Sequence, residues 1–292
     1  MFIKLATNFD AYQVTFFRSL LAAITVLIIT RKDGLRINAF GIMCSIIYAA
    51  LLFLFVWATK HTTAANAIFL QYTAPIYILI LAPFVIGEKF HLRDLITVIF
   101  CLAGMSLFFV GDLTIGDVQG NIAALCSGIF LGLYIMLLKH PRATGTASIP
   151  ACDVVTTEET PSQASMLAAP VAPPLNPVIT VIYGNFLLAL LTLPSGIAAV
   201  PTATLTDYAA VAFLGIVQIG ISYVLFIKGV RSGTRPLDAS IIGFIEPLLN
   251  PVWVFLIIGE RPSQWAILGG TVIIITVLVH TIAQYRRPPS TA

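Results

Sequence analysis

The sequence predicts an all-α membrane protein: a polytopic bundle of about nine transmembrane helices arranged as two inverted repeats. Three observations predict this fold class: the composition, the length of the apolar segments, and a sequence pattern that occurs twice. Of the 292 residues, 58% are hydrophobic and only 10% are charged. The mean hydropathy is +0.96. These values lie far outside the range of soluble domains.

Nine apolar segments are long enough to cross a membrane. A hydrocarbon core of about 30 Å takes about 20 apolar residues as a helix. We expect helices because lipid offers no partner to an open strand edge. The segments cover approximately residues 12–30, 39–59, 64–87, 95–110, 121–138, 178–198, 208–227, 239–258 and 265–285.

Lysine and arginine residues predict the orientation. If the Arg286–Arg287 pair is cytoplasmic, alternation across nine spans puts twelve cations inside and three outside, namely Lys4, Lys60 and Arg261. We therefore expect the N-terminus outside and a multi-pass protein of the inner or plasma membrane. The net charge of +3 is a topology signal, so no nucleic-acid partner is expected.

A proline-rich stretch divides the chain. Residues 139–177 hold seven prolines and three acids, which favours extended chain and predicts a cytoplasmic loop; a partner-binding segment is the alternative. Residues 1–138 would hold the first repeat, without its first helix, and the first helix of the second repeat, with a boundary near 115. Residues 178–287 would complete the second repeat, and 288–292 would form a tail.

Two stretches of sequence resemble each other at an offset of 172 residues: "TAPIYILILAPFVIGEK" from residue 73 and "IEPLLNPVWVFLIIGER" from residue 245. The offset pairs the structural motif residues Pro75 with Pro247, Gly87 with Gly259, and Glu88 with Glu260. Counting spans puts Glu88 inside and Glu260 outside, so the copies are inverted. Inverted repeats are typical of secondary transporters, whose substrate site lies near the membrane midplane between the repeats.

The pattern of a proline followed by Gly-Glu at a helix end resembles the drug/metabolite transporter superfamily, EamA type. The stretch "AYQVTFFRSLLAAITVLI" also resembles that family's second helix with its arginine. The resemblance covers nearly the whole chain apart from the central loop, and it implies a carrier with two five-helix repeats. The family's first helix is absent and "MFIKLATN" resembles its tail, so we expect nine helices here instead of ten.

Glu246 is the sharpest candidate for a functional residue. It lies about a third of the way into its predicted span, where a charged side chain costs about 2.5 to 3.5 kcal/mol on insertion scales. Its partner at the 172-residue offset is Ala74. Residues that both repeats share indicate a structural role, whereas an acid that occurs in one repeat only indicates a functional role. The alternative is a packing ion pair with another span, for example with Arg18.

Other polar residues share a helix face with Glu246. Gly243, Glu246, Asn250 and Trp253 recur at steps of three, four and three, which is one face of a helix. Two prolines in the same stretch leave backbone carbonyls without a hydrogen-bond donor. This face is therefore a candidate site for a substrate or a proton.

Further candidates lie on other spans. Arg18 would bind a substrate carboxylate or extend outward to the membrane surface. Gln71 maps onto Gly243 and lies four residues before Pro75. The remaining candidates are polar or aromatic: Tyr72, Gln218 and Tyr134 foremost, then Tyr48, Trp57, Asn66, Thr73, Tyr77, Tyr183, Asn185 and Ser222. For each one alone, hydrogen bonding between helices or an interfacial anchor is the alternative; together they would line a cavity for a small amphipathic solute.

The sequence shows no catalytic, metal or cofactor motif. The four histidines are scattered, no HxxxH pair occurs, and no GxxxxGK[ST] loop is present. We expect a carrier, not an enzyme, as a monomer or homodimer. It would work by alternating access and export a small metabolite, amino acid or amphipathic drug, with coupling to protons or another cation. The rival classes are a membrane-embedded enzyme and a membrane subunit without transport activity.

Overall fold

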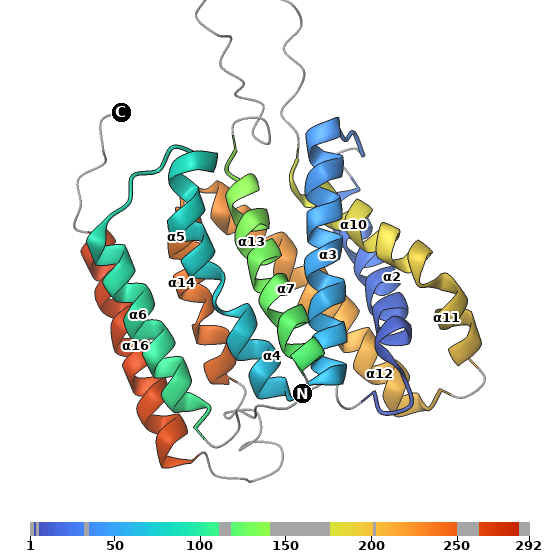
Figure 1. The fold of residues 1–292 in the computed structure, drawn as a ribbon. Helices are drawn as coiled ribbons and strands as arrows, with labels where there is room; N and C mark the ends of the chain where they lie inside the picture. Colours follow the sequence, from blue (N-terminus) through green and yellow to red (C-terminus); the bar gives the residue numbers. More distant parts are fainter. Residues whose placement is uncertain are drawn as a thin grey trace, which may run out of the picture.

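The computed structural model describes Ile3 and residues 6–31, 35–110, 118–140, 176–200, 203–249 and 263–285. Within these ranges the regular structure is entirely helical (Figure 1). The helices are α2 (Ala11–Thr30), α3 (Ala39–His61), α4 (Ala64–Gln71), α5 (Ala74–Val85), α6 (Leu92–Phe108), α7 (Val118–Leu137), α10 (Val178–Leu191), α11 (Leu193–Ala199), α12 (Leu205–Phe213), η1 (Leu214–Ile221), α13 (Ser222–Arg231), α14 (Pro236–Gly243) and α16 (Gln264–Tyr285). Residues 245–249 are also helical.

The predicted fold class, an all-α polytopic membrane bundle, is confirmed. Six helical spans in the described residues are long and apolar enough to cross a membrane, and a seventh is reached if the bent pair α10 and α11 counts as one span. The count of nine stays a prediction. Helix α6 has 17 residues and is thus about 25 Å long, and the predicted span 239–258 runs beyond the described residues.

Several predicted spans are broken helices, which the apolar pattern did not indicate. The segment expected at 64–87 is interrupted at Tyr72 and Thr73, and α5 then begins at Ala74 with Pro75 in its first turn. The segment at 178–198 bends by 65° at Thr192, just before Pro194. Proline lacks the N–H that would continue the preceding helix. Hydropathy therefore predicts the extent of a span, whereas proline determines where its helix is interrupted. The segment at 239–258 begins earlier, at Pro236, and turns at Phe244.

Side chains from the sequence cap several of these helices. Asp10 and Gln13 form a capping box at the start of α2, and Thr204 and Asp207 form one at α12. Asn38 accepts a hydrogen bond from the backbone at the start of α3. Such caps satisfy N–H groups that lack a partner within the helix.

The 172-residue offset holds for helix boundaries as well as for residues. Helices α4 and α14 both have eight residues, and their first residues are Ala64 and Pro236. The first residues of α6 and α16, Leu92 and Gln264, are also 172 apart. Each of α4 and α14 is followed by a break and a further helical segment. At this offset the repeat therefore covers α4 to α6 and α14 to α16.

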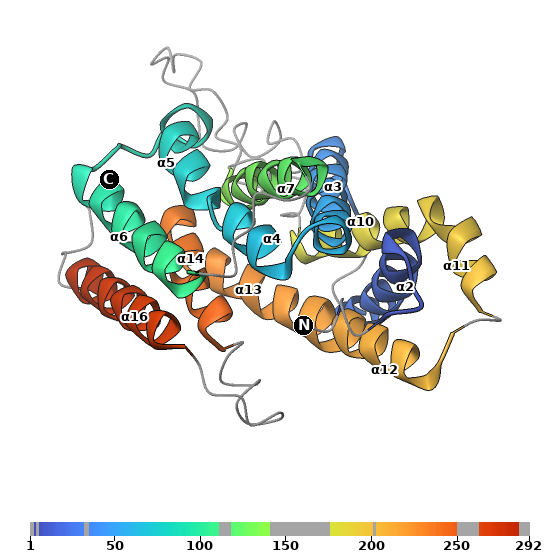
Figure 2. The ribbon, with the colours of Figure 1, turned by 60° about the horizontal axis from the view of Figure 1, so that its bottom comes forward.

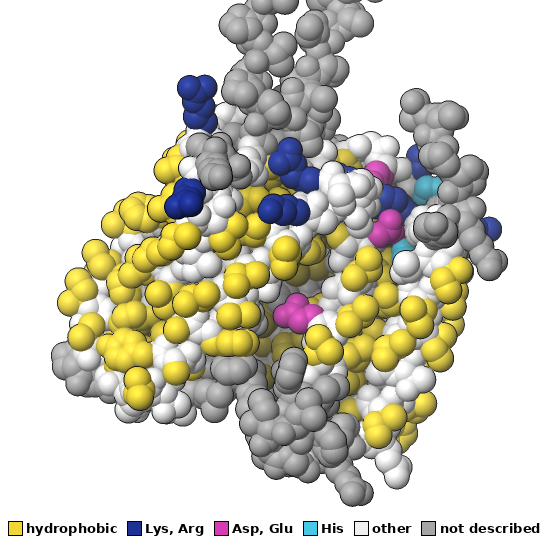
Figure 3. Space-filling view, turned by 180° about the vertical axis from the view of Figure 1, so that it is seen from behind, with side chains coloured by type: hydrophobic (Ala, Val, Ile, Leu, Met, Phe, Trp, Pro, Cys, Tyr) yellow, Lys and Arg dark blue, Asp and Glu magenta, His cyan; other side chains and the backbone are white. Residues whose placement is uncertain are grey.

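The two repeats run in opposite directions. Arg235, the N-cap of α14, contacts Glu88, which follows the last turn of α5. Helix α14 therefore begins at the end of the bundle where α5 ends (Figure 1). We call this end the Arg235 end. Lysine and arginine side chains gather at one edge of the face in Figure 3.

Equivalent helices of the two repeats pack against each other. Helix α2 packs on α10, and α6 packs on α16 at one side of the bundle (Figure 2). A Cβ on Gly269 would collide with the backbone of Gly104 and Phe108, so the second pair crosses very closely. Helix α7 packs on α3, α4 and α5. The predicted boundary near 115, most of the 139–177 loop and the 288–292 tail lie outside the described residues.

Candidate functional site

Glu246 lies where the two repeats meet. It follows the turn at Phe244, near the start of the helical segment 245–249. The hydroxyl of Tyr72, the C-cap of α4, donates a hydrogen bond to Oε2 of Glu246 at 2.9 Å. The helix break of the first repeat is thus joined directly to that of the second.

The carboxylate of Glu246 is also accessible. The residue keeps an exposed surface, although many protein atoms lie around it. Among the described acids it is the exposed one within a helical span. Figure 3 shows an acidic side chain in a hollow at mid-height, apart from the charged groups at the edge of that face. An accessible acid at this depth is what an intramembrane binding group requires.

Tyr72 and Phe244 occupy equivalent positions of the two repeats, since their numbers differ by 172. Their rings pack against each other with centroids 5.3 Å apart. A Cβ on Gly243 would also lie 3.8 Å from the Tyr72 ring. The two helix breaks therefore meet around one local centre, where the inverted-repeat prediction expects a substrate site.

Arg18 is buried in α2, with only 2% of its surface exposed. Its Nη2 donates to the carbonyl oxygen of Leu52 at 3.3 Å, and its Nε has no hydrogen-bond partner. The side chain therefore does not extend to the membrane surface. Among the ion pairs of the described residues, none joins Arg18 to Glu246. The packing ion pair considered from the sequence is not present.

Three tyrosines of α3, α7 and α13 pack together; we call Tyr48, Tyr134 and Tyr223 the tyrosine cluster. The ring of Tyr48 lies 5.0 Å from each of the other two. Tyr223 lies within electrostatic range of both Glu246 and Arg18. The tyrosine cluster therefore lies in the same part of the bundle as the acid and the buried cation.

Hydrogen bonds from neighbouring residues fix the positions of two members of the tyrosine cluster. Asn185 donates to the Tyr48 hydroxyl at 3.2 Å, and the hydroxyls of Tyr134 and Thr180 lie 2.9 Å apart. The sequence singled out Tyr48, Tyr134 and Asn185 but missed Tyr223. Its position beside Ser222 on a predicted span was the available signal, and a lone tyrosine on an apolar span carries little information.

The other sequence candidates are dispersed. Gln71 donates to Ser127 at 2.8 Å, and Ser127 donates to the Leu51 carbonyl, so Gln71 ties α4 to α7 and α3. Gln218 lies on η1, a stretch of π-helix, a form that is frequent at functional sites. Asn66 donates to Asn121 near the start of α4. Asn250, Trp253, Gly259 and Glu260 lie outside the described residues.

Three further candidates are better explained by local contacts. Tyr183 donates to the Leu35 carbonyl, and Trp57 stacks on His61 in the last turns of α3. Ser222 donates to the Val217 carbonyl within its own span. These contacts match the hydrogen-bonding and anchoring alternatives that the sequence left open.

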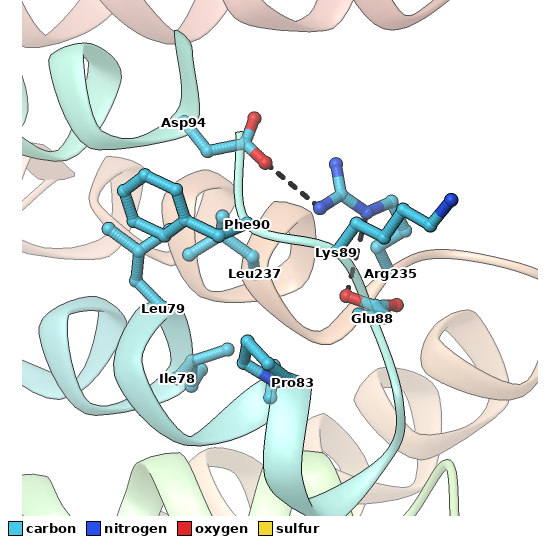
Figure 4. Close-up of a pocket in the computed structure, with 10 residues that line it drawn as sticks. Ile78, Leu79, Pro83, Glu88, Lys89, Phe90, Asp94, Arg235 and Leu237 are labelled. Atoms are coloured by element: carbon cyan, nitrogen blue, oxygen red, sulfur yellow. Dashed lines mark hydrogen bonds and ion pairs between the residues drawn. The ribbon is translucent and has the colours of Figure 1, made fainter. Parts of the chain in front are cut away.

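A second polar group lies at the Arg235 end; we call Glu88, Asp94, Arg235, Asp238 and His280 the ionic cluster. Arg235 Nη2 donates to Asp94 Oδ2 at 2.9 Å, and its Nε lies 3.6 Å from Glu88 Oε2 (Figure 4). Arg235 Nη1 lies 3.8 Å from Asp238 Oδ1, and His280 Nε2 lies 2.8 Å from the same oxygen. The cluster contains residues of both repeats.

The Gly-Glu motif positions one member of the ionic cluster. Gly87 has a φ of +71°, a left-handed conformation that glycine adopts without strain, and it turns the chain after α5. Glu88 then faces Arg235. Burial raises the pKa of Glu88 above its ordinary value, with the cations Arg235 and Lys139 acting in the opposite direction. Burial likewise lowers the pKa of Lys139, against the effect of Glu88 and Asp238.

The described residues contain no group of three or more His, Cys, Asp or Glu side chains suited to a metal ion. The site is instead an acid, aromatic rings and a buried cation between two inverted halves. Such an arrangement can bind a proton or a charged organic solute.

Comparison with known proteins identifies the family. Residues 1–110 and 164–282 match the model of the EamA-like transporter family, which covers both repeats. The chain belongs to the EamA-like transporter family. This membership confirms the predicted resemblance, and it supports a multi-pass membrane transporter of the drug/metabolite type. The family consists of transporters, not enzymes.

A solved crystal structure shares the fold. It superposes with a TM-score of 0.68 and covers 98% of this chain and 95% of its own, at 16% sequence identity. At that identity the similarity extends to the fold alone. No curated protein matches the chain.

Proposed function

We propose that this EamA-like transporter is a secondary carrier that exports a small metabolite, an amino acid or an amphipathic drug by alternating access, with Glu246 binding a proton or a cationic group of the substrate. The observation that carries the proposal is the hydrogen bond from Tyr72 to an accessible carboxylate at the junction of the two repeats. The protein would act in the inner or plasma membrane, as a monomer or homodimer.

The position of the hydrogen bond supports a role in alternating access. Tyr72 belongs to the first repeat and Glu246 to the second, so any rotation of one repeat against the other changes their separation. A proton or an ammonium group of the substrate would compete with the tyrosine hydroxyl for the carboxylate. Binding at Glu246 would then be linked to the relative position of the repeats.

Arg18 supplies the opposite charge near the tyrosine cluster. Its Nε lacks a partner and its one hydrogen bond is long, so the guanidinium retains capacity for an anionic group. A substrate with a carboxylate would use Arg18, whereas a simple cation would use Glu246 alone. A uniporter or an exchanger fits the same residues. Coupling to a proton gradient requires the most of Glu246, because the carboxylate must then bind and release a proton in each transport cycle.

Transport by the purified chain in liposomes tests the proposal. The panel would contain amino acids, nucleosides, sugars and cationic drugs, each measured with and without a pH gradient. We expect one class to move and Glu246→Gln to reduce its flux at least tenfold, roughly the effect of losing one charge-assisted contact. Tyr72→Phe, which keeps the ring and removes the hydroxyl, should retain transport with altered pH dependence. Flux by Glu246→Gln with the wild-type rate and pH dependence would refute the role of this residue.

A further inference from the structure

The ionic cluster contains direct bonds between the repeats. Arg235 belongs to the second repeat, at the start of α14. Glu88 and Asp94 belong to the first repeat, after α5 and in the first turn of α6. We propose that Arg235, Glu88 and Asp94 form a latch that holds the Arg235 end of the carrier closed, and that these bonds break when the substrate path opens at that end. The inference rests on the proposed alternating access.

Asp94 depends strongly on the latch. Its side chain is 1% exposed, and Oδ2 accepts the hydrogen bond from Arg235. Its other oxygen, Oδ1, is buried and has no hydrogen-bond partner. Removing the cation would leave a buried charge that protein does not compensate, which is strongly unfavourable unless water enters. Loss of Arg235 therefore favours an arrangement in which water reaches this end.

The residues beneath the latch are apolar and closely packed. Ile78, Leu79 and Leu237 lie under the ion pairs, and each is at most 6% exposed (Figure 4). Ala82 lines the same small pocket and is 5% exposed. The ion pairs thus lie next to an apolar layer of buried side chains. A substrate path through this end requires both layers to separate.

The helices that carry the latch are parts of broken spans. Glu88 follows α5, which begins after the break at Tyr72, and Arg235 precedes α14, which ends at the break at Phe244. Because the two breaks meet at the Tyr72–Glu246 hydrogen bond, a change there moves α5 and α14 relative to each other. The central site and the latch are connected through these two short helices.

Two of the three equivalent positions at the opposite end are uncharged, and the third, Glu260, lies outside the described residues. Arg235 corresponds to Thr63 and Asp94 to Ala266 at the 172-residue offset. Thr63 instead accepts a hydrogen bond from the Asn66 backbone as the cap of α4. A threonine and an alanine cannot form an ion pair. Among the described residues, the Arg235–Asp94 ion pair therefore has no counterpart at these two positions, and in the proposed latch it favours closure at the Arg235 end.

Labelling of a single cysteine tests the latch without a substrate. Ala82→Cys would be introduced into a full-length chain in which Cys44, Cys101, Cys126 and Cys152 are replaced by alanine, and the purified protein would be treated with a polar maleimide. We expect slow labelling with the latch intact. Arg235→Gln should raise the rate about tenfold, because truncating one partner of a partly buried ion pair favours the open, hydrated arrangement. Arg235→Lys should restore much of the slow labelling.

His91→Gln is the matched control. His91 lies 3.8 Å from Asp94 but belongs to the same repeat, and its side chain is 45% exposed. Its loss removes a polar neighbour of Asp94 without removing a bond between the repeats. We expect labelling at the wild-type rate.

Glu88→Gln provides a second variant if Arg235→Gln does not yield a monodisperse protein. Its side chain is 28% exposed, so folding tolerates the change better, and it should raise labelling by a smaller factor. Unchanged labelling in a folded Arg235→Gln or, failing that, in Glu88→Gln would overturn the latch. Faster labelling in a protein that transports none of the panel would retain the latch and refute the proposed carrier function.

Discussion

The broken helix α4–α5 and its counterpart, α14 with residues 245–249, have the same layout and different surroundings. Helix α7 covers the first break closely: a Cβ on Gly128 would lie 2.8 Å from the carbonyl oxygen of Gln71. At the second break, the Tyr72 ring is the one group of the described residues that a Cβ on Gly243 would meet within 4 Å. The exposed Glu246 lies on this open side and the buried Ala74 on the covered side. The repeat supplies the scaffold, and the surroundings decide which copy can hold a charge.

The same comparison distinguishes the two ends of the bundle. Thr63 and Asn66 begin α4 with neutral hydrogen bonds, whereas Arg235 and Asp238 begin α14 within the ionic cluster. A pair of inverted repeats with identical ends would have no preferred side. Substitutions at equivalent positions therefore make the two ends of the bundle chemically different.

The largest expected effect comes from placing the acid in the wrong copy. Ala74 is 1% exposed, so Ala74→Glu would bury a charge beneath α7 without a partner. We expect a loss of about 3 to 5 kcal/mol in stability, or failure to fold. Thermal unfolding in detergent measures this change. Ala74→Gln is the control for side-chain size, and equal melting temperatures for the Glu variant and the wild type would show that the first break is as open as the second.

A smaller effect should separate the two breaks by packing alone. Gly128→Ala would force α7 away from the backbone at Gln71, and we expect a loss of about 1 to 3 kcal/mol from overpacking. Gly243→Ala has room for its methyl group and should leave the melting temperature nearly unchanged. Unfolding of the two variants under identical conditions makes the comparison. Equal losses of stability in the two variants would contradict the conclusion that the first break is packed more closely than the second.

The smallest expected effect is a pH dependence at the Arg235 end. Burial raises the pKa of Glu88 above its ordinary value of 4.5. The folded protein therefore binds this proton more tightly than the unfolded chain, so the stabilisation is complete below pH 4.5 and is lost as the pH rises through the raised pKa. Because Glu88 is partly exposed, we expect less than about 1 kcal/mol.

Melting curves of the wild type and Glu88→Gln between acidic and neutral pH check this prediction. The wild type should lose stability relative to the variant as the pH rises through that window. A difference that stays constant with pH, or that grows in favour of the wild type, would mean that Glu88 is not shifted upward by burial.

Some features of the site were predictable because they depend on local chemistry. A carboxylate within an apolar stretch is costly wherever it packs, so Glu246 was evident as a candidate. Gly87 and Glu88 marked a helix end, and the structure places a left-handed glycine there. The partner of Glu246 was not predictable, since Tyr72 lies 174 residues away in sequence and was one of many polar side chains on apolar spans.

The latch illustrates the same limit. Because Arg235 is a cation, the sequence predicted that it lies on the cytoplasmic side of the membrane, with most of the other lysine and arginine residues. Its bond to Asp94 spans 141 residues, and only the antiparallel packing of the repeats brings the two together. The alternatives for Arg18 were likewise settled by burial, because a side chain of that length reaches either the surface or the core from the same helical position.

The sequence by itself determined the membrane class, the helical architecture, the duplicated motif and Glu246, the acid that one repeat carries and the other lacks. These features depend on hydropathy, proline and charge, which are properties of the individual residues. The tertiary structure decided where the spans break, which tyrosine holds Glu246, and which end of the bundle carries the ion pairs. These depend on contacts between residues far apart in the chain. Such contacts are fixed by the packing of whole helices, which no local pattern specifies.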